Sequence, residues 1–172
     1  MAAKRRHTGT SRARKKSRIE RDSLGEMQVS ATALYGIRTL RSMRNLSFSG
    51  RALGLYPQYV NALAIVKKAA ARANSDADVI DPKIADAIEG ACDEILRSED
   101  RSNFLVDALG GGGGIAVNMN VNEVIANLAN EALGGARGTY SPGRSEAPRQ
   151  RVAVDRRRMP YRGAHRDHQK MA

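Results

Sequence analysis

The stretch that constrains the fold most is Asn118-Met119-Asn120-Val121-Asn122-Glu123-Val124-Ile125-Ala126-Asn127. Apolar residues recur through it and beyond at steps of three and four, which places them on one face of a helix: Val121, Ile125, Leu128 and Ala132. This helix is expected to end at Gly134–Gly135, because glycine readily takes the left-handed conformation that closes a helix. Five glycines, Gly110–Gly114, precede it. They suit either a flexible linker or a loop that offers backbone N–H groups to an anion.

Three further helices are expected upstream of this stretch. The first runs from Thr32 to about Asn45, with Leu34, Ile37 and Leu40 on one face. The third opens at Asp81–Pro82, an N-cap followed by proline at the first helical position. The second shows the clearest apolar stripe, formed by Tyr56, Tyr59, Leu63, Val66, Ala70 and Ala73. Together with a short β hairpin expected over residues 19–30, these segments predict a mainly α fold.

The basic charge of the chain lies at its ends. The 172 residues carry a net charge of +11. Residues 1–18 contribute +8 and residues 143–172 contribute +6, whereas residues 19–142 are mildly acidic at −3. Both ends lack apolar periodicity, so we expect them to be disordered tails. The first suits a transit peptide, a nucleic-acid-binding arm or a solvated extension; no aromatic side chain in it could stack on bases, so nucleic-acid binding is not expected.

Residue usage excludes several classes of protein. The single cysteine, Cys92, rules out a disulfide framework and a multi-thiolate metal site, and suits a buried position in a cytoplasmic protein. No uncharged stretch reaches the roughly 20 apolar residues of a membrane-spanning helix, so no membrane association is expected. No metal site and no cofactor are predicted.

Several stretches carry a resemblance to a known family. Residues 18–26, Arg-Ile-Glu-Arg-Asp-Ser-Leu-Gly-Glu, and residues 34–41, Leu-Tyr-Gly-Ile-Arg-Thr-Leu-Arg, resemble the opening of an aspartate ammonia-lyase of the aspartase/fumarase superfamily. Residues 67–74, Lys-Lys-Ala-Ala-Ala-Arg-Ala-Asn, resemble the next helix of that family. Phe104-Leu105-Val106-Asp107 and the stretch from Asn118 resemble its first signature region. The Tyr-Gly-Ile sequence favours aspartase over fumarase.

The resemblance implies the domain organisation. Residues 18–142 correspond to the helical N-terminal domain of the aspartase/fumarase fold, preceded by a basic extension over 1–17 and followed by a tail over 143–172. In the family this domain precedes the long helices of a tetrameric core, so the expected partners are further copies of the chain or a homologous lyase. L-aspartate and fumarate are the implied ligands of the intact family.

The first signature region implies a substrate-binding site that is altered here. The family has Thr and Ser where this chain has Ile115 and Ala116, so both hydroxyl donors to a substrate carboxylate are absent. Each lost hydrogen bond to a charged group costs about 1.5–3 kcal/mol. Asn118, Asn120 and Asn122 match the family and are the candidate substrate-binding residues. Capping of the helix start is the alternative role for these asparagines.

No residue is assigned as catalytic. The family converts L-aspartate to fumarate and ammonia: a base removes the proton beside a carboxylate and the resulting dianion is held by preorganised donors. The family's serine loop, which carries that base, has no counterpart in the 172 residues. The chain alone is therefore expected to be inactive. The alternatives are a non-catalytic fragment that docks on a full-length homologous lyase, and a fragment of a fumarase-type lyase.

The tail after residue 142 has the pattern of a frameshift. Shifting the reading frame by one base across residues 150–163 permits Asn-Ala-Ser-Gln-Ser-Thr-Asp-Asp-Val-Cys-Pro-Thr-Ala. This string resembles the family's second signature region at the expected distance from Tyr140. We therefore hypothesise that residues from about 143 on are translated out of frame, which the wobble bases of the gene decide.

Overall fold

The computed structural model describes residues 16–110 and 114–139. The predicted tails, 1–17 and 143–172, lie outside these residues apart from Lys16 and Ser17. The described residues form two strands, four α-helices and one short 3-10 helix: β1 (Ser17–Asp22), β2 (Gly25–Ser30), α1 (Ile37–Asn45), η1 (Leu53–Leu55), α2 (Pro57–Asp76), α3 (Pro82–Arg97) and α4 (Ile115–Ala132). The mainly α fold with a short β hairpin is confirmed.

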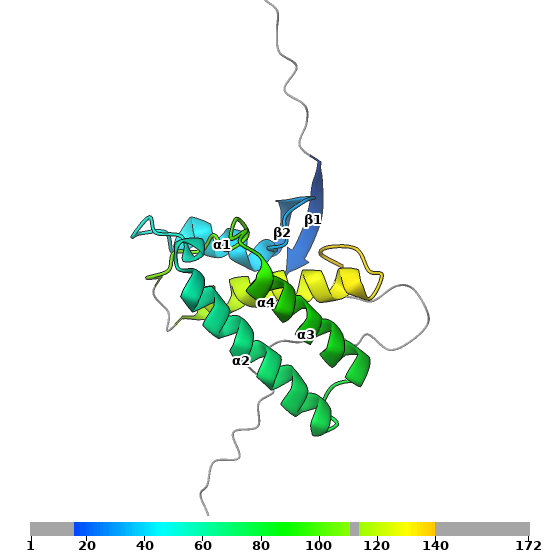
Figure 1. The fold of residues 1–172 in the computed structure, drawn as a ribbon. Coiled ribbons are helices and arrows are strands. Elements are labelled where there is room, and N and C mark those ends of the chain that lie inside the picture. Colours follow the sequence, from blue (N-terminus) through cyan, green and yellow to red (C-terminus); the bar gives the residue numbers. More distant parts are fainter. Residues whose placement is uncertain (1–15, 111–113, 140–172) are drawn as a thin grey trace, which may run out of the picture.

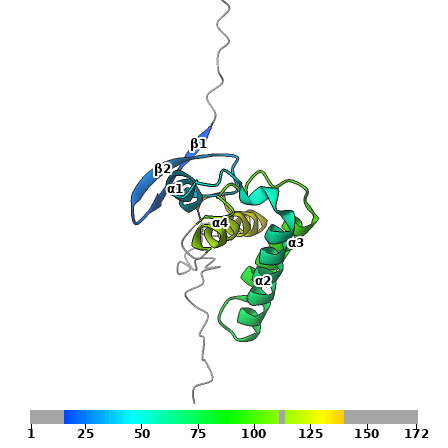
Figure 2. The same ribbon diagram turned by 90° about the vertical axis from the view of Figure 1, so that its left-hand side faces the viewer.

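Helix α4 lies in the middle of the molecule (Figure 1). The consecutive helices α2 and α3 run side by side as a hairpin against one side of it, while α1 and the β hairpin lie on the other side (Figure 2). Twelve of the eighteen residues of α4 are buried. A helix with buried residues all round needs partners on every side, which explains why the other elements gather around α4.

The β hairpin is tied to α1 by an ion pair. Strands β1 and β2 pair antiparallel from Ser17 opposite Ser30 to Asp22 opposite Gly25. The guanidinium of Arg41 on α1 donates to both carboxylate oxygens of Asp22 at 2.8 Å. This fork holds the pKa of Asp22 below its ordinary value. The hairpin therefore packs at a fixed place on α1.

Helix α1 begins later than predicted. The sequence pattern predicts a start at Thr32, but residues 32–36 are not helical and the helix begins at Ile37. Its N-cap, Gly36, offers no side chain. Instead the backbone N–H groups of its first turn are bound by carboxylates from other elements, Glu20 of β1 and Glu123 of α4. Since this cap is tertiary, local sequence does not reveal it.

Helix α2 packs with a different face from the one predicted. Within the predicted stripe, Leu63 and Ala70 are half-buried, but Tyr59, Val66 and Ala73 are exposed. The buried residues of α2 are Val60, Ala64 and Ala71. The prediction of the face was wrong because α2 is apolar on two opposite faces, and periodicity alone does not say which of them meets the core.

Helices α3 and α4 end and begin largely as expected. Asp81 caps α3, its carboxylate accepting the N–H of Lys83 at 2.8 Å, and Gly134 follows α4 in the left-handed conformation with φ of +80°. Cys92 is fully buried on α3, and burial raises the pKa of its thiol to about 12. Its predicted place in the core is therefore confirmed.

Candidate functional site

The candidate site lies at the start of α4, where the first signature region was predicted. Gly114 is the N-cap of α4 and takes the left-handed conformation, with φ of +76°. That turn lets the chain enter the helix directly at Ile115. Residues 111–113 lie outside the described residues, so the two interpretations of the glycine run stay open.

The three predicted asparagines all lie inside α4 rather than at its cap. Ile115 is the first helical residue, so Asn118 already falls in the fourth position. The alternative role as helix-start caps is therefore wrong. Residues two apart on a helix point to nearly opposite sides, whereas residues four apart share a side. Asn118 and Asn122 consequently share one side, and Asn120 points away from them.

Asn120 holds the preceding loop against α4. Its side chain is fully buried, with its Oδ1 accepting the N–H of Leu105 at 2.9 Å and its Nδ2 donating to the carbonyl of Asn103 at 2.9 Å. A weaker bond of 3.4 Å runs from the N–H of Val106. Because these backbone groups occupy both ends of the amide, the geometry assigns Asn120 a structural role. No ligand-accessible face of the side chain remains.

Asn118 contacts Lys67, a residue that was not predicted to belong to the site. The Nζ of Lys67, on α2, donates to the Oδ1 of Asn118 at 2.6 Å. This contact turns the Nδ2 donors of the amide away from the ammonium group. Asn122 lies one turn further along and is 6% exposed, and its Oδ1 is buried without a hydrogen-bond partner among the described residues. We call Lys67, Asn118 and Asn122 the α4 amide group.

Ile115 and Ala116, predicted to stand at the hydroxyl positions of the family, differ in their surroundings. Ile115 is 59% exposed and lies on the same side of α4 as the amide group. Ala116 is 4% exposed and belongs to the hydrophobic core. The structure therefore places Ile115 on the accessible side of α4 and Ala116 in the core.

A buried carboxylate organises the loops that precede the site. The Oδ2 of Asp107 accepts the N–H groups of Phe48 (3.1 Å), Ser49 (2.7 Å) and Gly50 (3.1 Å). Its Oδ1 accepts the hydroxyl of Ser49 at 2.5 Å and the N–H of Leu109 at 2.9 Å. These donors, with the Ser49 hydroxyl foremost, hold the pKa of Asp107 below its ordinary value. The carboxylate thus holds residues 48–50 and Leu109 together, directly before the start of the glycine run.

Glu123 is a second buried carboxylate that sequence reasoning missed. It accepts the N–H groups of Gly36, Arg38 and Thr39 at 2.9 to 3.0 Å, so it lies at the positive end of the α1 dipole. Burial raises the pKa of this carboxyl, and the hydrogen bonds oppose that rise. All its described oxygen contacts are internal, so Glu123 serves the fold. The sequence around Glu123 does not reveal this role, because its partners on α1 lie more than 80 positions away.

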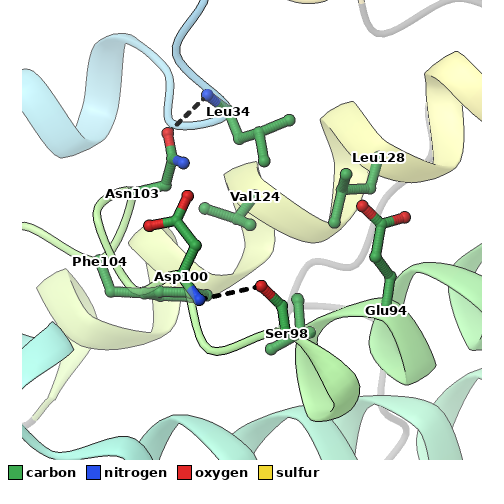
Figure 3. Close-up of a pocket in the computed structure, with 9 residues that line it drawn as sticks. Leu34, Glu94, Ser98, Asp100, Asn103, Phe104, Val124 and Leu128 are labelled. Atoms are coloured by element: carbon green, nitrogen blue, oxygen red, sulfur yellow. Dashed lines mark hydrogen bonds between the residues drawn. The ribbon is translucent and has the colours of Figure 1, made fainter.

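A small cavity lies elsewhere on the molecule, between the end of α3 and α4 (Figure 3). Its volume is about 100 Å³, and apolar side chains such as Phe104, Val124 and Leu128 line it. Its charged lining residues are Glu94 and Asp100, and no basic residue faces it. Two carboxylates would repel a dicarboxylate ligand, so this cavity does not suit the substrates expected for the family.

The described residues show neither a metal cluster nor a membrane helix. Within 16–110 and 114–139, no group of three or more His, Cys, Asp or Glu side chains is placed to hold a metal ion. None of the helices in that part of the chain has the length and apolar character that crossing a membrane requires.

A family model described as Lyase matches residues 25–153. The chain belongs to this lyase family. The match ends beyond residue 142, the last residue of the predicted lyase domain, and its final part lies outside the described residues.

Relatives within the family are aspartate ammonia-lyases and class II fumarases, which places the chain in the aspartase/fumarase superfamily. The aspartate ammonia-lyase of Pseudomonas aeruginosa is 48% identical over 124 residues, covering 72% of this chain and 26% of that protein. The class II fumarate hydratase of Halobacterium salinarum is 50% identical over 117 residues, covering 68% and 24%. The chain therefore spans about a quarter of the length of the curated relatives it matches.

Solved structures show the same fold. The fumarate lyase:delta crystallin of Brucella melitensis superposes with a TM-score of 0.70 at 47% identity, covering 73% of this chain and 29% of that chain. The class II fumarase of Schistosoma mansoni gives a TM-score of 0.67 at 33% identity, covering 80% and 28%. The expected N-terminal helical domain of the aspartase/fumarase fold is confirmed.

Proposed function

We propose that the α4 amide group binds a carboxylate of L-aspartate or fumarate, as one part of an aspartase-type active site. The contact between Lys67 and Asn118 carries this proposal. It combines the positive charge of Lys67 with the amide of Asn118, on the side of α4 where Ile115 is exposed, and charged groups and N–H donors are what binds a carboxylate most strongly. The aspartate ammonia-lyase relatives supply the choice of ligand.

The chemistry implied by the family is β-elimination of ammonia from L-aspartate. A base takes the proton beside the carboxylate, the electron pair forms the fumarate double bond, and ammonia leaves from the next carbon. The amide group would hold a carboxylate while that charge develops. Because no serine loop is recognised in the 172 residues, we propose that this chain alone has no lyase activity. That none of the 172 residues acts as the catalytic base is part of this proposal.

Fumarate formation tests the inactivity of the chain. Purified protein mixed with L-aspartate should give no rise in the ultraviolet absorbance of fumarate above a blank without protein. A parallel reaction with L-malate tests the fumarase-type alternative, which the Halobacterium salinarum relative favours. Turnover of either substrate would contradict the proposal and would identify the activity at once.

Ligand binding tests the site itself, independently of turnover. Fumarate titrated into the ¹⁵N-labelled chain should shift the side-chain amide signal of Asn118, while that of the buried Asn127 stays in place. Ile115→Thr restores an exposed hydroxyl and should tighten fumarate binding roughly tenfold. Ala116→Ser is the matched control, because its hydroxyl would enter the core. Equal gains in both variants, or no shift at Asn118, would contradict the assignment.

A second candidate function is docking on a full-length homologous lyase. It is favoured by two exposed apolar side chains, Phe48 (67% exposed) and Leu109 (63%), whose backbone N–H groups both bind Asp107. Loops held in place with apolar tips suit a partner surface. Co-purification with a homologous aspartate ammonia-lyase should be lost in Phe48→Asp. A chain that stays monomeric beside that lyase would contradict docking.

We also propose a cytoplasmic location and an out-of-frame tail after residue 142. The buried, unpaired Cys92 supports a reducing compartment. The tail lies outside the described residues, so the gene decides the second point. Wobble bases that do not spell the family's second signature region in the shifted frame would contradict it.

A further inference from the structure

Asn122 carries a buried hydrogen-bond acceptor, its Oδ1 atom, that no described residue satisfies. The other asparagines of α4 each bind a side chain or a backbone group: Asn118, Asn120, Asn127 and Asn130. Asn122 itself is only 6% exposed. About nine in ten buried polar groups in proteins have a hydrogen-bond partner, so this oxygen points to a donor from outside the described residues.

The Oδ1 atom of Asn130 also lacks a partner among the described residues, but the loop after α4 closes over it. The Nδ2 of Asn130 donates to the carbonyl of Ala136 at 2.5 Å, and a Cβ at Gly135 would lie too close to the Oδ1 atom. Asn122 has a different setting, because it shares one side of α4 with Ile115. Ile115 is 59% exposed, so this side of the helix is open to solvent at its start.

A pair of residues that suits a carboxylate lies one helical turn from Asn122. The Nζ of Lys67 donates to the Oδ1 of Asn118 at 2.6 Å, so a positive charge and amide N–H groups are close together. Four residues of helix separate Asn118 from Asn122 by about 6 Å along the axis. In a four-carbon amino acid the ammonium group and the distant carboxylate are about 4 Å apart, so one hydrogen bond at each end covers this spacing.

We infer that Asn122 is a specificity-determining residue, whose amide oxygen accepts an N–H of the ammonium group of a bound amino acid. This role rests on the proposed function, because Lys67 and Asn118 must hold the carboxylate first. L-aspartate, L-malate and succinate share one four-carbon dicarboxylate skeleton and differ in a single substituent. That substituent is an ammonium with three charged donors in L-aspartate, a hydroxyl with one donor in L-malate and a hydrogen atom in succinate.

The three acids therefore depend on Asn122 to different degrees. A hydrogen bond from a charged donor is worth roughly tenfold or more in affinity, and one from a neutral donor is worth less. Asn122 should thus strengthen the binding of L-aspartate by about tenfold and that of L-malate by a smaller factor. Succinate and fumarate offer no donor and gain nothing from it. The site then distinguishes the substrate of an ammonia-lyase from its product.

Titration of the three acids into the ¹⁵N-labelled chain, followed at the side-chain amide signal of Asn118, tests this role. In Asn122→Leu the affinity for L-aspartate should fall about tenfold, that for L-malate should fall by less, and that for succinate should stay unchanged. Each acid is compared between two proteins, so the charge of the acid itself cancels. Asn74→Leu is the matched control in the last turn of α2 and should leave all three affinities unchanged.

Asn122→Asp covers the case in which leucine does not fit the site. It keeps the size of the side chain and an acceptor oxygen, so L-aspartate should lose far less affinity than succinate, which the added charge repels. Parallel changes for the three acids in both variants would overturn the role of Asn122 and leave the carboxylate site standing. Absence of binding by all three acids to the wild type would overturn the proposed function together with this role.

Discussion

Glu123 is the residue on which the placement of α1 depends most. Its carboxylate binds three backbone N–H groups at the start of α1, and a neutral amide offers only one acceptor oxygen. In Glu123→Gln at least one buried N–H would face an NH₂ group. We expect a loss of about 2–3 kcal/mol in the free energy of unfolding, measured by urea titration at neutral pH.

The matched control for this prediction lies on the same helix. Glu131 is 38% exposed at its side chain and pairs with Arg137 at the surface. Glu131→Gln should change the free energy of unfolding by less than about 0.5 kcal/mol. Similar losses in the two variants would show that the capping of α1 by Glu123 does not stabilise the fold.

Asp107 gives the fold a dependence on acid pH. Its pKa in the folded chain is held below the ordinary value of 3.8, chiefly by the Ser49 hydroxyl, so the folded state binds the proton less readily than the unfolded state. The stabilisation is therefore present above the ordinary pKa and is lost as the pH falls through the folded one. Urea titrations across this range should show wild type more stable than Asp107→Asn at neutral pH. The difference should shrink in acid, and a constant difference would contradict the assignment.

At the scale of the elements, Asp81 tests whether α3 depends on its own cap. The carboxylate accepts the N–H of Lys83 in the first turn, ahead of Pro82. Removing a carboxylate N-cap costs about 1 kcal/mol, so Asp81→Ala should lower the free energy of unfolding by that amount. Asp81→Asn keeps an acceptor oxygen and should retain most of it. An unchanged midpoint for Asp81→Ala in urea would show that Pro82 alone sets the helix start.

The elements also show which features of the fold can be predicted from sequence. The start of α3 and the end of α4 were predicted correctly because Asp81 and Gly134 act locally. The start of α1 was not, because its cap comes from Glu20 and Glu123, far away in the chain. The packing face of α2 was ambiguous since both of its faces are apolar.

The place of the candidate site could be predicted from the sequence, but not which residues form it. Resemblance to the family located the three asparagines. However, residues two apart on a helix point to nearly opposite sides. Asn120 was therefore grouped with Asn118 although it binds backbone groups on the other side of α4. Lys67 could be added only from the packing of α2 on α4, because 51 positions separate it from Asn118.

At the scale of the whole molecule, Ile125 belongs to the hydrophobic core that several helices share. It is fully buried on α4, in a core cluster that also includes residues of α2, α3 and the loop before α4. Truncating Ile125 would leave a cavity in a core that several elements share. Movement of one element alone would therefore not fill it. Ile125→Ala should therefore lower the free energy of unfolding by about 3–4 kcal/mol.

Ile115 provides the comparison that separates burial from residue type. It is the same amino acid on the same helix, but it is 59% exposed. Ile115→Ala should lower the free energy of unfolding by less than about 1 kcal/mol, because most of its side chain already contacts water. Since a domain of this size has only about 5–15 kcal/mol in total, the urea midpoint should move far for Ile125→Ala and little for Ile115→Ala. Equal shifts of the urea midpoint in the two variants would contradict the central place of Ile125 in the core.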